Sequence, residues 1–329
     1  MKVGLALYCD RPSRDLGDMA AAAEQAGFAE MWWADHYNTR ELATVLTMSV
    51  VKTSTIKVGT GVTSVLLRHP SVLASLYASL AELSEGRVIA GLGPGGWEVT
   101  AELNVTTMSP LGATREATVM LRRLLAGAVV ETPESRHYPV HRAALKFAPP
   151  TPVPIYLAGR GPRMLELAGE LADGVITHGL SSSYLNLVRD CRATGAAKTG
   201  RSPDSCEVAL WIEVALGERS QAIAKLRPKS LLMVGGGYDE SLIPRYGLDP
   251  EQVMKVRKSV RAGDSAGAVG MITDEMVEAF NLGGPPAWIV ERLRELEEKG
   301  VNSVMLSLGE GAELSEIAEL GRGLREVMS

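Results

Sequence analysis

Residues 155–179 read IYLAGRGPRMLELAGELADGVITHG, a stretch with the pattern strand, helix, strand. The apolar runs Ile155–Ala158 and Val175–Thr177 have the length of buried strands, and the amphipathic segment Arg163–Leu171 between them predicts a helix. Two strands joined through a helix pair in parallel within one sheet. The segment therefore predicts one unit of a parallel α/β fold.

The same alternation extends over the whole chain. Eight apolar segments have strand character, and each is followed by an amphipathic segment or a helical insertion. They are Val3–Leu7, Glu30–Ala34, Ile56–Val62, Arg87–Leu92, Ile155–Ala158, Val175–Thr177, Glu207–Ala215 and Val301–Leu308. Eight such units in 329 residues predict a (β/α)8 TIM barrel, a single domain over residues 1–329. An open doubly wound sheet is the alternative, since apolar runs alone do not exclude it.

Two stretches interrupt the alternation. Residues 127–153 are rich in proline and contain strand-like pieces at 129–131 and 145–147, which predict a hairpin-like excursion. Residues 225–284, after the seventh strand, predict an insertion of mixed helices. We expect both to be additions to the one barrel rather than separate domains.

Composition narrows the class of protein. The net charge is −5, from 34 basic and 39 acidic residues, which argues against a nucleic-acid-binding protein. No apolar run approaches the roughly 18 residues of a membrane span. The first residues, MKVGLALYCD, predict a strand rather than a signal peptide, and three scattered cysteines indicate a reducing compartment. We therefore expect a cytoplasmic protein.

In a TIM barrel the active site lies where the strands end. His36 follows the second strand, and an imidazole there can exchange a proton near neutral pH. Asp35 beside it either fixes the tautomer of His36 or binds backbone. The fourth strand ends in a GxGxxG pattern, but the acidic residue that a Rossmann site needs is represented only by Glu116, inside a predicted helix. A dinucleotide site is therefore disfavoured.

The turn Gly159-Arg160-Gly161 precedes a predicted helix. Free N–H groups at a helix start, together with the Arg160 guanidinium, favour a bound phosphate. The other interpretation is a plain strand-to-helix turn. The spacing HxxxH occurs once, at His137 and His141 in the proline-rich excursion, and GxSxG once, at residues 263–267 in the helical insertion. Neither lies at the end of one of the eight predicted strands, so we expect no metal site and no covalent hydrolysis.

Several motifs in order resemble one known family. WADHYNTR at 33–40, KVGTGVT at 57–63, RHP at 68–70, EGR at 85–87 and GLGPG at 91–95 resemble the F420-dependent methylenetetrahydromethanopterin reductase group of the luciferase-like superfamily. Residues 155–179 and 272–308 are similar to further segments of that superfamily. The resemblance implies a luciferase-type barrel, a homodimer and coenzyme F420, a deazaflavin that transfers hydride to or from an organic substrate. An FMN-dependent monooxygenase and a non-catalytic flavin-binding protein are the alternatives.

The resemblance also implies roles for individual residues. Asp35 and His36 would lie beside the deazaflavin ring as catalytic residues. A cis peptide bond is expected between Gly61 and Val62, in the segment behind the ring. The residues implied to bind the cofactor are Thr60, Gly61, Val62, Gly93, Gly159, Arg160, Gly161, Thr177, His178 and Gly179, the last six at its phosphate end.

Two positions depart from the family pattern. Ala6 stands where the reductases carry a glutamate on strand one, and Gly96 stands where they carry an aspartate. Glu98 is near enough in sequence to replace the missing acid. Because both positions lie on the substrate side, the resemblance implies a relative that keeps the cofactor half and has changed its substrate. In residues 225–261 eight basic residues stand against four acidic ones, either a solvated face or a flap over the anionic F420 tail.

Overall fold

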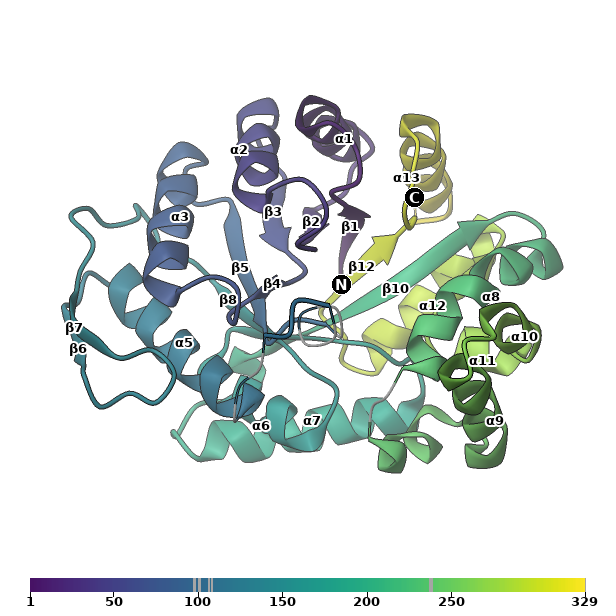
Figure 1. Cartoon of the computed structure of the whole chain (residues 1–329). Coiled ribbons are helices and arrows are strands. Elements are labelled where there is room, and N and C mark those ends of the chain that lie inside the picture. The colour runs from purple at the N-terminus through teal and green to yellow at the C-terminus, as the bar shows by residue number, and fades with distance from the viewer. Residues whose placement is uncertain (97–98, 100–101, 106, 108, 237–238, 329) are drawn as a thin grey trace.

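A computed structural model describes residues 1–96, 99, 102–105, 107, 109–236 and 239–328. Within these residues eight parallel strands close into a ring (Figure 1). In ring order they are β1 (Lys2–Tyr8), β2 (Glu30–Ala34), β3 (Lys57–Thr60), β5 (Val88–Gly93), β8 (Ile155–Ala158), β9 (Gly174–Thr177), β10 (Glu207–Leu216) and β12 (Ser303–Ser307). The ring closes because β12 pairs with β1, Val3 opposite Val304. The predicted TIM barrel is confirmed, and the open sheet is excluded.

Helices follow the strands and surround the ring, as Figure 1 shows. They are α1 (Ser13–Gln25), α2 (Leu42–Lys52), α3 (Pro70–Leu83), α5 (Pro110–Leu125), α6 (Pro162–Leu171), α7 (Ser182–Ala197), α8 (Arg219–Gly235), α12 (Pro286–Glu298) and α13 (Leu314–Met328). Among the described residues no helix is both long and apolar enough to cross a bilayer.

The neighbouring residues Trp32 and Trp33 show how side chains divide across the barrel wall. Successive residues of a strand point to opposite faces. Trp33 packs in the layer between strands and helices and donates a hydrogen bond to Ser49 Oγ on α2 at 2.9 Å. Trp32 points into the lumen, where it packs with Ala6, Tyr156 and Met305. The lower lumen is thus filled by apolar and aromatic side chains.

The excursion at 127–153 contains two antiparallel strands, β6 (Val130–Thr132) and β7 (Val140–Ala143), at the left edge of Figure 1. The second strand lies at 140–143, and the prediction of a strand at 145–147 was wrong. Leu145 is only partly buried and Phe147 is exposed, so the two apolar side chains do not belong to a buried strand. The hairpin lies outside the ring.

The insertion follows α8, which continues unbroken through the expected boundary at 225. Its elements are η2 (Glu240–Leu242), η3 (Pro244–Tyr246), α9 (Pro250–Arg261), α10 (Ser265–Gly270), α11 (Asp274–Glu278) and β11 (Leu282–Gly284). The short strand β11 pairs in parallel with the end of β10, Val214 opposite Leu282. This pairing extends the wall of the barrel beyond strand seven and brings Asn281 to the mouth.

Candidate active site

A cavity with two lobes opens at the carboxyl ends of the strands. The larger lobe has a volume of about 810 Å³ and the smaller about 460 Å³, the size of cofactor and ligand pockets in general. Both lobes are lined by Ala34, His36, Gly61, Val62, Ala158, Ile176, His178, Leu232 and Met233. The shared wall therefore contains small residues from β2, from β8 and from the segment after β3, together with apolar residues of β9 and α8.

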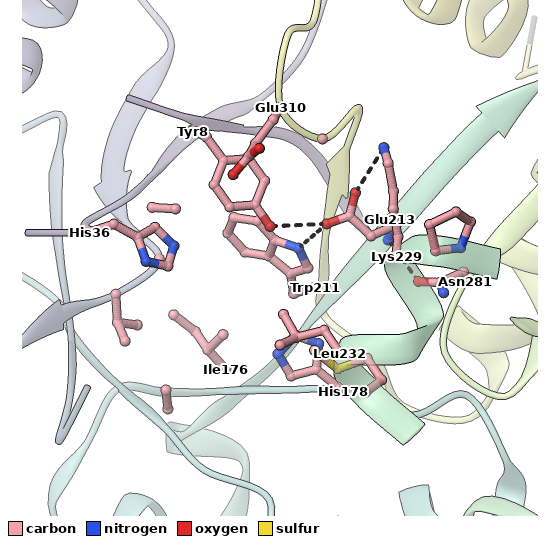
Figure 2. Close-up of a pocket in the computed structure, with 17 residues that line it drawn as sticks. Tyr8, His36, Ile176, His178, Trp211, Glu213, Lys229, Leu232, Asn281 and Glu310 are labelled. Atoms are coloured by element: carbon pink, nitrogen blue, oxygen red, sulfur yellow. Dashed lines mark hydrogen bonds and ion pairs between the residues drawn. The ribbon is translucent and has the colours of Figure 1, made fainter. Parts of the chain in front are cut away.

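His36 lies at the junction of the lobes. Its ring stacks on Tyr8 of β1 with 5.7 Å between centroids and an interplanar angle of 19° (Figure 2). The imidazole is only partly buried, so one side faces the cavity. A ring held flat against Tyr8 has little freedom to rotate, which suits a group that must meet a ligand in one orientation.

Asp35 is held by basic and hydroxyl groups rather than left free. Arg68 contacts it twice, Nε to Oδ2 at 3.3 Å and Nη2 to Oδ1 at 3.2 Å, and Thr63 donates to Oδ2 at 2.5 Å. The Asp35 side chain is only 8% exposed, although the residue lines the larger lobe. These contacts fix the turn that carries His36.

The third strand presents its end to the cavity. Gly61 and Val62 line both lobes, and the peptide bond between them is cis. Thr60 is fully buried behind them, where its Oγ1 contacts Tyr77 Oη at 2.8 Å and donates to the Gly91 carbonyl oxygen at 2.7 Å. Thr60 therefore holds β3 against α3 and β5, and it is not among the residues that line the two lobes.

Three other predicted residues lie at strand ends but are packed into the wall of the cavity. Gly93 is buried in β5, where an added Cβ would lie 3.0 Å from Val62 Cγ2. Thr177 is fully buried and its Oγ1 contacts Tyr184 Oη at 2.6 Å. Gly179 is buried against Tyr246 and has φ +113. The lining of the two lobes among the described residues includes none of the three.

Of the residues predicted to hold the phosphate, Gly159, Arg160 and His178 line the larger lobe. Gly161 is the N-cap of α6, which has no side-chain cap. The Tyr184 hydroxyl donates to the Arg160 carbonyl oxygen at 3.0 Å. His178 lies in the wall that both lobes share, where burial, followed by the Arg160 charge, lowers its pKa to about 3. This part of the cavity thus combines a guanidinium, a helix start and a neutral imidazole.

Sequence reasoning missed six residues that line the smaller lobe but not the larger. These are Tyr8 from β1, Trp211 and Glu213 from β10, Lys229 from α8, Asn281, and Glu310 after β12. One signal was present in the sequence, because Trp211 and Glu213 are two residues apart on a strand and share a face. A charged residue on the inward face at a strand end indicates a site.

The two departures from the family pattern have different outcomes. Ala6 is fully buried in the lumen, where no solvent reaches it. Gly96 lines the larger lobe. Glu98, the suggested replacement for the missing acid, lies outside the described residues. The position on strand one is therefore part of the apolar packing and not of the site.

The predicted basic flap, residues 225–261, offers fewer basic side chains to a ligand than its eight basic residues suggest. Arg227 pairs with Asp274, and Arg257 is buried with its Nε donating to the Val234 carbonyl oxygen at 3.2 Å. Lys229 points into the smaller lobe. Three of the eight basic residues are thus engaged within the protein, and the others are exposed. Much of the excess is an ordinary solvated face.

Comparisons with known proteins agree with this geometry. A model of the luciferase-like monooxygenase family matches residues 2–303, so the chain belongs to that family. The chain is 32% identical over 306 residues to the 5,10-methylenetetrahydromethanopterin reductase of Methanolobus tindarius, covering 93% of each. It is 30% identical over 227 residues to the F420-dependent glucose-6-phosphate dehydrogenase of Kineococcus radiotolerans, covering 64% of this chain and 67% of that one.

The structure of the coenzyme F420-dependent tetrahydromethanopterin reductase from Methanopyrus kandleri matches with a TM-score of 0.88 and 28% identity, covering 100% of this chain and 99% of that one. The resemblance read from the motifs is confirmed. Among the described residues no group of three or more His, Cys, Asp or Glu is placed to hold a metal ion.

Proposed function

We propose that the protein is a coenzyme F420-dependent oxidoreductase that moves hydride between the deazaflavin and a small organic substrate. The observation that carries this proposal is the two-lobed cavity, with a basic end at Arg160 and a polar end at Glu213. Both lobes have volumes in the general range of small-molecule sites, so the cavity has room for a cofactor in the larger lobe and a substrate in the smaller. F420 is the cofactor in the names of several relatives.

The cavity walls fit a flat ring. Ala34, Gly61 and Ala158 line both lobes and leave open space between the strands. An added Cβ at Gly61 would lie 2.8 Å from the Trp211 ring, so backbone itself forms this wall. Apolar side chains from β9 and α8, Ile176 and Met233, complete it. A deazaflavin bound between these walls would supply a two-electron hydride acceptor or donor.

Each residue around the ring then has a defined task. Arg160 and the start of α6 hold the phosphate. His36 donates to or accepts from the reacting centre, and Asp35 keeps the His36 turn in place through Arg68. Gly61 and Val62 back the ring. Thr60, Gly93, Thr177 and Gly179 act indirectly, by holding strands and turns around it.

Fluorescence quenching on titration with F420 and, separately, with FMN tests the cofactor. We expect F420 to bind at least about tenfold more tightly, which corresponds to 1.4 kcal/mol. The Arg160→Met variant should weaken F420 binding, while Arg189→Met, at an exposed position on α7, should not. Tighter binding of FMN would instead support the monooxygenase alternative, and hydride transfer would then no longer follow.

We further propose that the protein is a homodimer and cytoplasmic. Exposed apolar side chains on adjacent helices support the first proposal: Val51 on α2, and Val72 and Leu83 on α3, are 61, 63 and 52% exposed. Three free, buried cysteines support the second. Light scattering behind a sizing column gives the mass directly, and Val72→Asp together with Leu83→Asp should shift it to that of a monomer.

A further inference from the structure

The polar end of the smaller lobe is organised around Glu213. Trp211 Nε1 donates to Glu213 Oε1 at 3.1 Å and the Tyr8 hydroxyl donates to the same oxygen at 3.4 Å. Lys229 Nζ approaches the other oxygen, Oε2, at 3.5 Å. Figure 2 shows these three groups converging on the carboxylate from two strands and a helix. The Glu213 side chain is only 12% exposed, so it is a built feature of the cavity wall.

Oε2 retains acceptor capacity for a ligand. A carboxylate has about four acceptor positions, and the contacts from Trp211 and Tyr8 both go to Oε1. The Lys229 ammonium has its shorter hydrogen bond elsewhere, to the Leu308 carbonyl oxygen at 2.8 Å. Burial, and next the Glu213 charge, raise the pKa of Tyr8, so its phenol keeps the proton that it donates. A ligand must therefore bring a donor of its own to Oε2.

The formal charges of this lobe also select against anions. Its described lining contains the carboxylates of Glu213 and Glu310 and one ammonium, Lys229. That ammonium is already held by two oxygens, so it offers little to an incoming anion. The guanidinium group, which phosphates and carboxylates prefer as a partner, is that of Arg160, and it lines the larger lobe instead.

Strand register explains why Glu213 takes this position. Ala6 of β1 and Glu213 of β10 are both paired with Ser307 of β12, so they lie two strands apart around the ring. Ala6 is apolar and fully buried. At the level of Ser307 the carboxylate therefore comes from Glu213 of β10, because β1 has alanine at the corresponding position.

We propose that Glu213 determines substrate specificity: the smaller lobe takes a small, uncharged or cationic molecule that donates a hydroxyl or amino hydrogen bond to Glu213, and it excludes anionic substrates. This inference rests on the proposed function, because it assigns the substrate lobe beside the cofactor lobe. Glu213 does not line the lobe assigned to the cofactor, so an experiment can distinguish a failure of this proposal from a failure of the proposed function.

Calorimetric titration with three probes of matched shape tests the proposal. Cyclohexanol, cyclohexylamine and cyclohexanecarboxylate are titrated into F420-loaded protein at neutral pH. We expect cyclohexanecarboxylate to bind at least about tenfold more weakly than cyclohexanol, because a like charge beside a desolvated carboxylate is disfavoured. Cyclohexylamine should bind at least as tightly as the alcohol.

Variants locate the effect. Glu213→Gln should reduce the tenfold gap between the affinities for cyclohexanol and cyclohexanecarboxylate to less than about threefold. Glutamine keeps the shape of the side chain and removes its charge. Glu213→Asp keeps the charge and should still exclude the carboxylate. Glu298→Gln, at an exposed position on α12, should leave the gap unchanged. All these variants should bind F420 as the parent protein does, which shows that they fold.

Three results would overturn the proposal: equal or tighter binding of the carboxylate, an unchanged gap in Glu213→Gln, or binding of none of the probes. If F420 itself does not bind, it is the proposed function that fails. The same titrations on cofactor-free protein then decide the role of Glu213, because its lobe is formed without the cofactor.

Discussion

Asp35 and Arg68 form a two-point ion pair at the mouth of the barrel, and the pair joins the turn after β2 to the loop before α3. Removing one partner of a mostly buried pair leaves a charge without compensation. We expect Arg68→Met to lower the free energy of unfolding by about 1–3 kcal/mol. Denaturant unfolding measures this, with Arg189→Met as the matched surface control. A variant as stable as its parent would show that Thr63 alone holds Asp35.

Replacing His36 tests its part in the reaction. We expect His36→Ala to lower turnover by at least about a hundredfold, the usual scale for a general acid–base group, while F420 affinity changes little. Turnover is measured with the best substrate found among small alcohols and amines. His141→Ala, at an exposed position in β7, is the control. Parallel loss of F420 affinity would make His36 a binding residue instead.

Stability should depend on pH through His178. Its folded-state pKa is lowered to about 3, by burial and then by Arg160, from an ordinary value of 6.5. Below pH 6.5 the unfolded chain takes up a proton that the folded chain refuses, so stability falls as pH falls from 6.5 towards 3. Between pH 7 and pH 5 the loss is up to about 2 kcal/mol.

Comparing His178→Gln with the parent protein isolates this contribution. The variant lacks the titrating group, so its loss of stability between the two pH values should be smaller by that amount. Unfolding free energies at both pH values give the difference. Identical pH dependence in the two proteins would mean that His178 takes up its proton in the folded state at an ordinary pH.

The opposite end of the barrel should affect stability only. Lys2 Nζ lies 3.0 Å from Glu30 Oε1 and 2.6 Å from Glu207 Oε2, and Glu30 is 1% exposed. Lys2→Met would leave the buried Glu30 carboxylate without its cation. We expect a loss of about 1–3 kcal/mol, below the range of a fully buried pair because Lys2 is partly exposed.

This loss should come without any change in F420 affinity, since these residues lie at the amino ends of the strands. Thermal unfolding and F420 titration of the same preparation measure both. Lys57→Met, an exposed lysine at the start of β3, is the control. Weakened F420 binding in Lys2→Met would show that the two ends of the barrel are coupled.

Two glycines should respond oppositely to the same change. A Cβ on Gly91 would lie 1.8 Å from the Thr60 carbonyl oxygen, whereas a Cβ on Gly161 would meet nothing within 4 Å. Gly91→Ala should therefore fail to fold or lose several kcal/mol, because backbone cannot yield that far. Gly161→Ala should keep the parent's stability. Circular dichroism melting curves compare them.

The order of short apolar runs and amphipathic segments was enough to predict the barrel and its eight strands. The reason is that the local spacing of apolar residues distinguishes a strand from a helix. Parallel strands joined through helices can then adopt only a few chain topologies. The alternation of side chains along a strand also accounts for Trp32 and Trp33 lying on opposite faces of β2. The same order of segments put His36, Gly61 and Arg160 at strand ends, where the cavity was found.

Only the tertiary structure decided which strand-end residues face the cavity. Thr60 and Thr177 occupy the expected positions, yet tyrosines from neighbouring helices bind their hydroxyls and keep them in the wall. Glu213 and Tyr8 are more than two hundred residues apart in the chain, and they meet because β12 closes the ring between β10 and β1. Which side chains share a lobe depends on the register of that closure and on the side chains packed behind each strand, and no local pattern in the sequence encodes either.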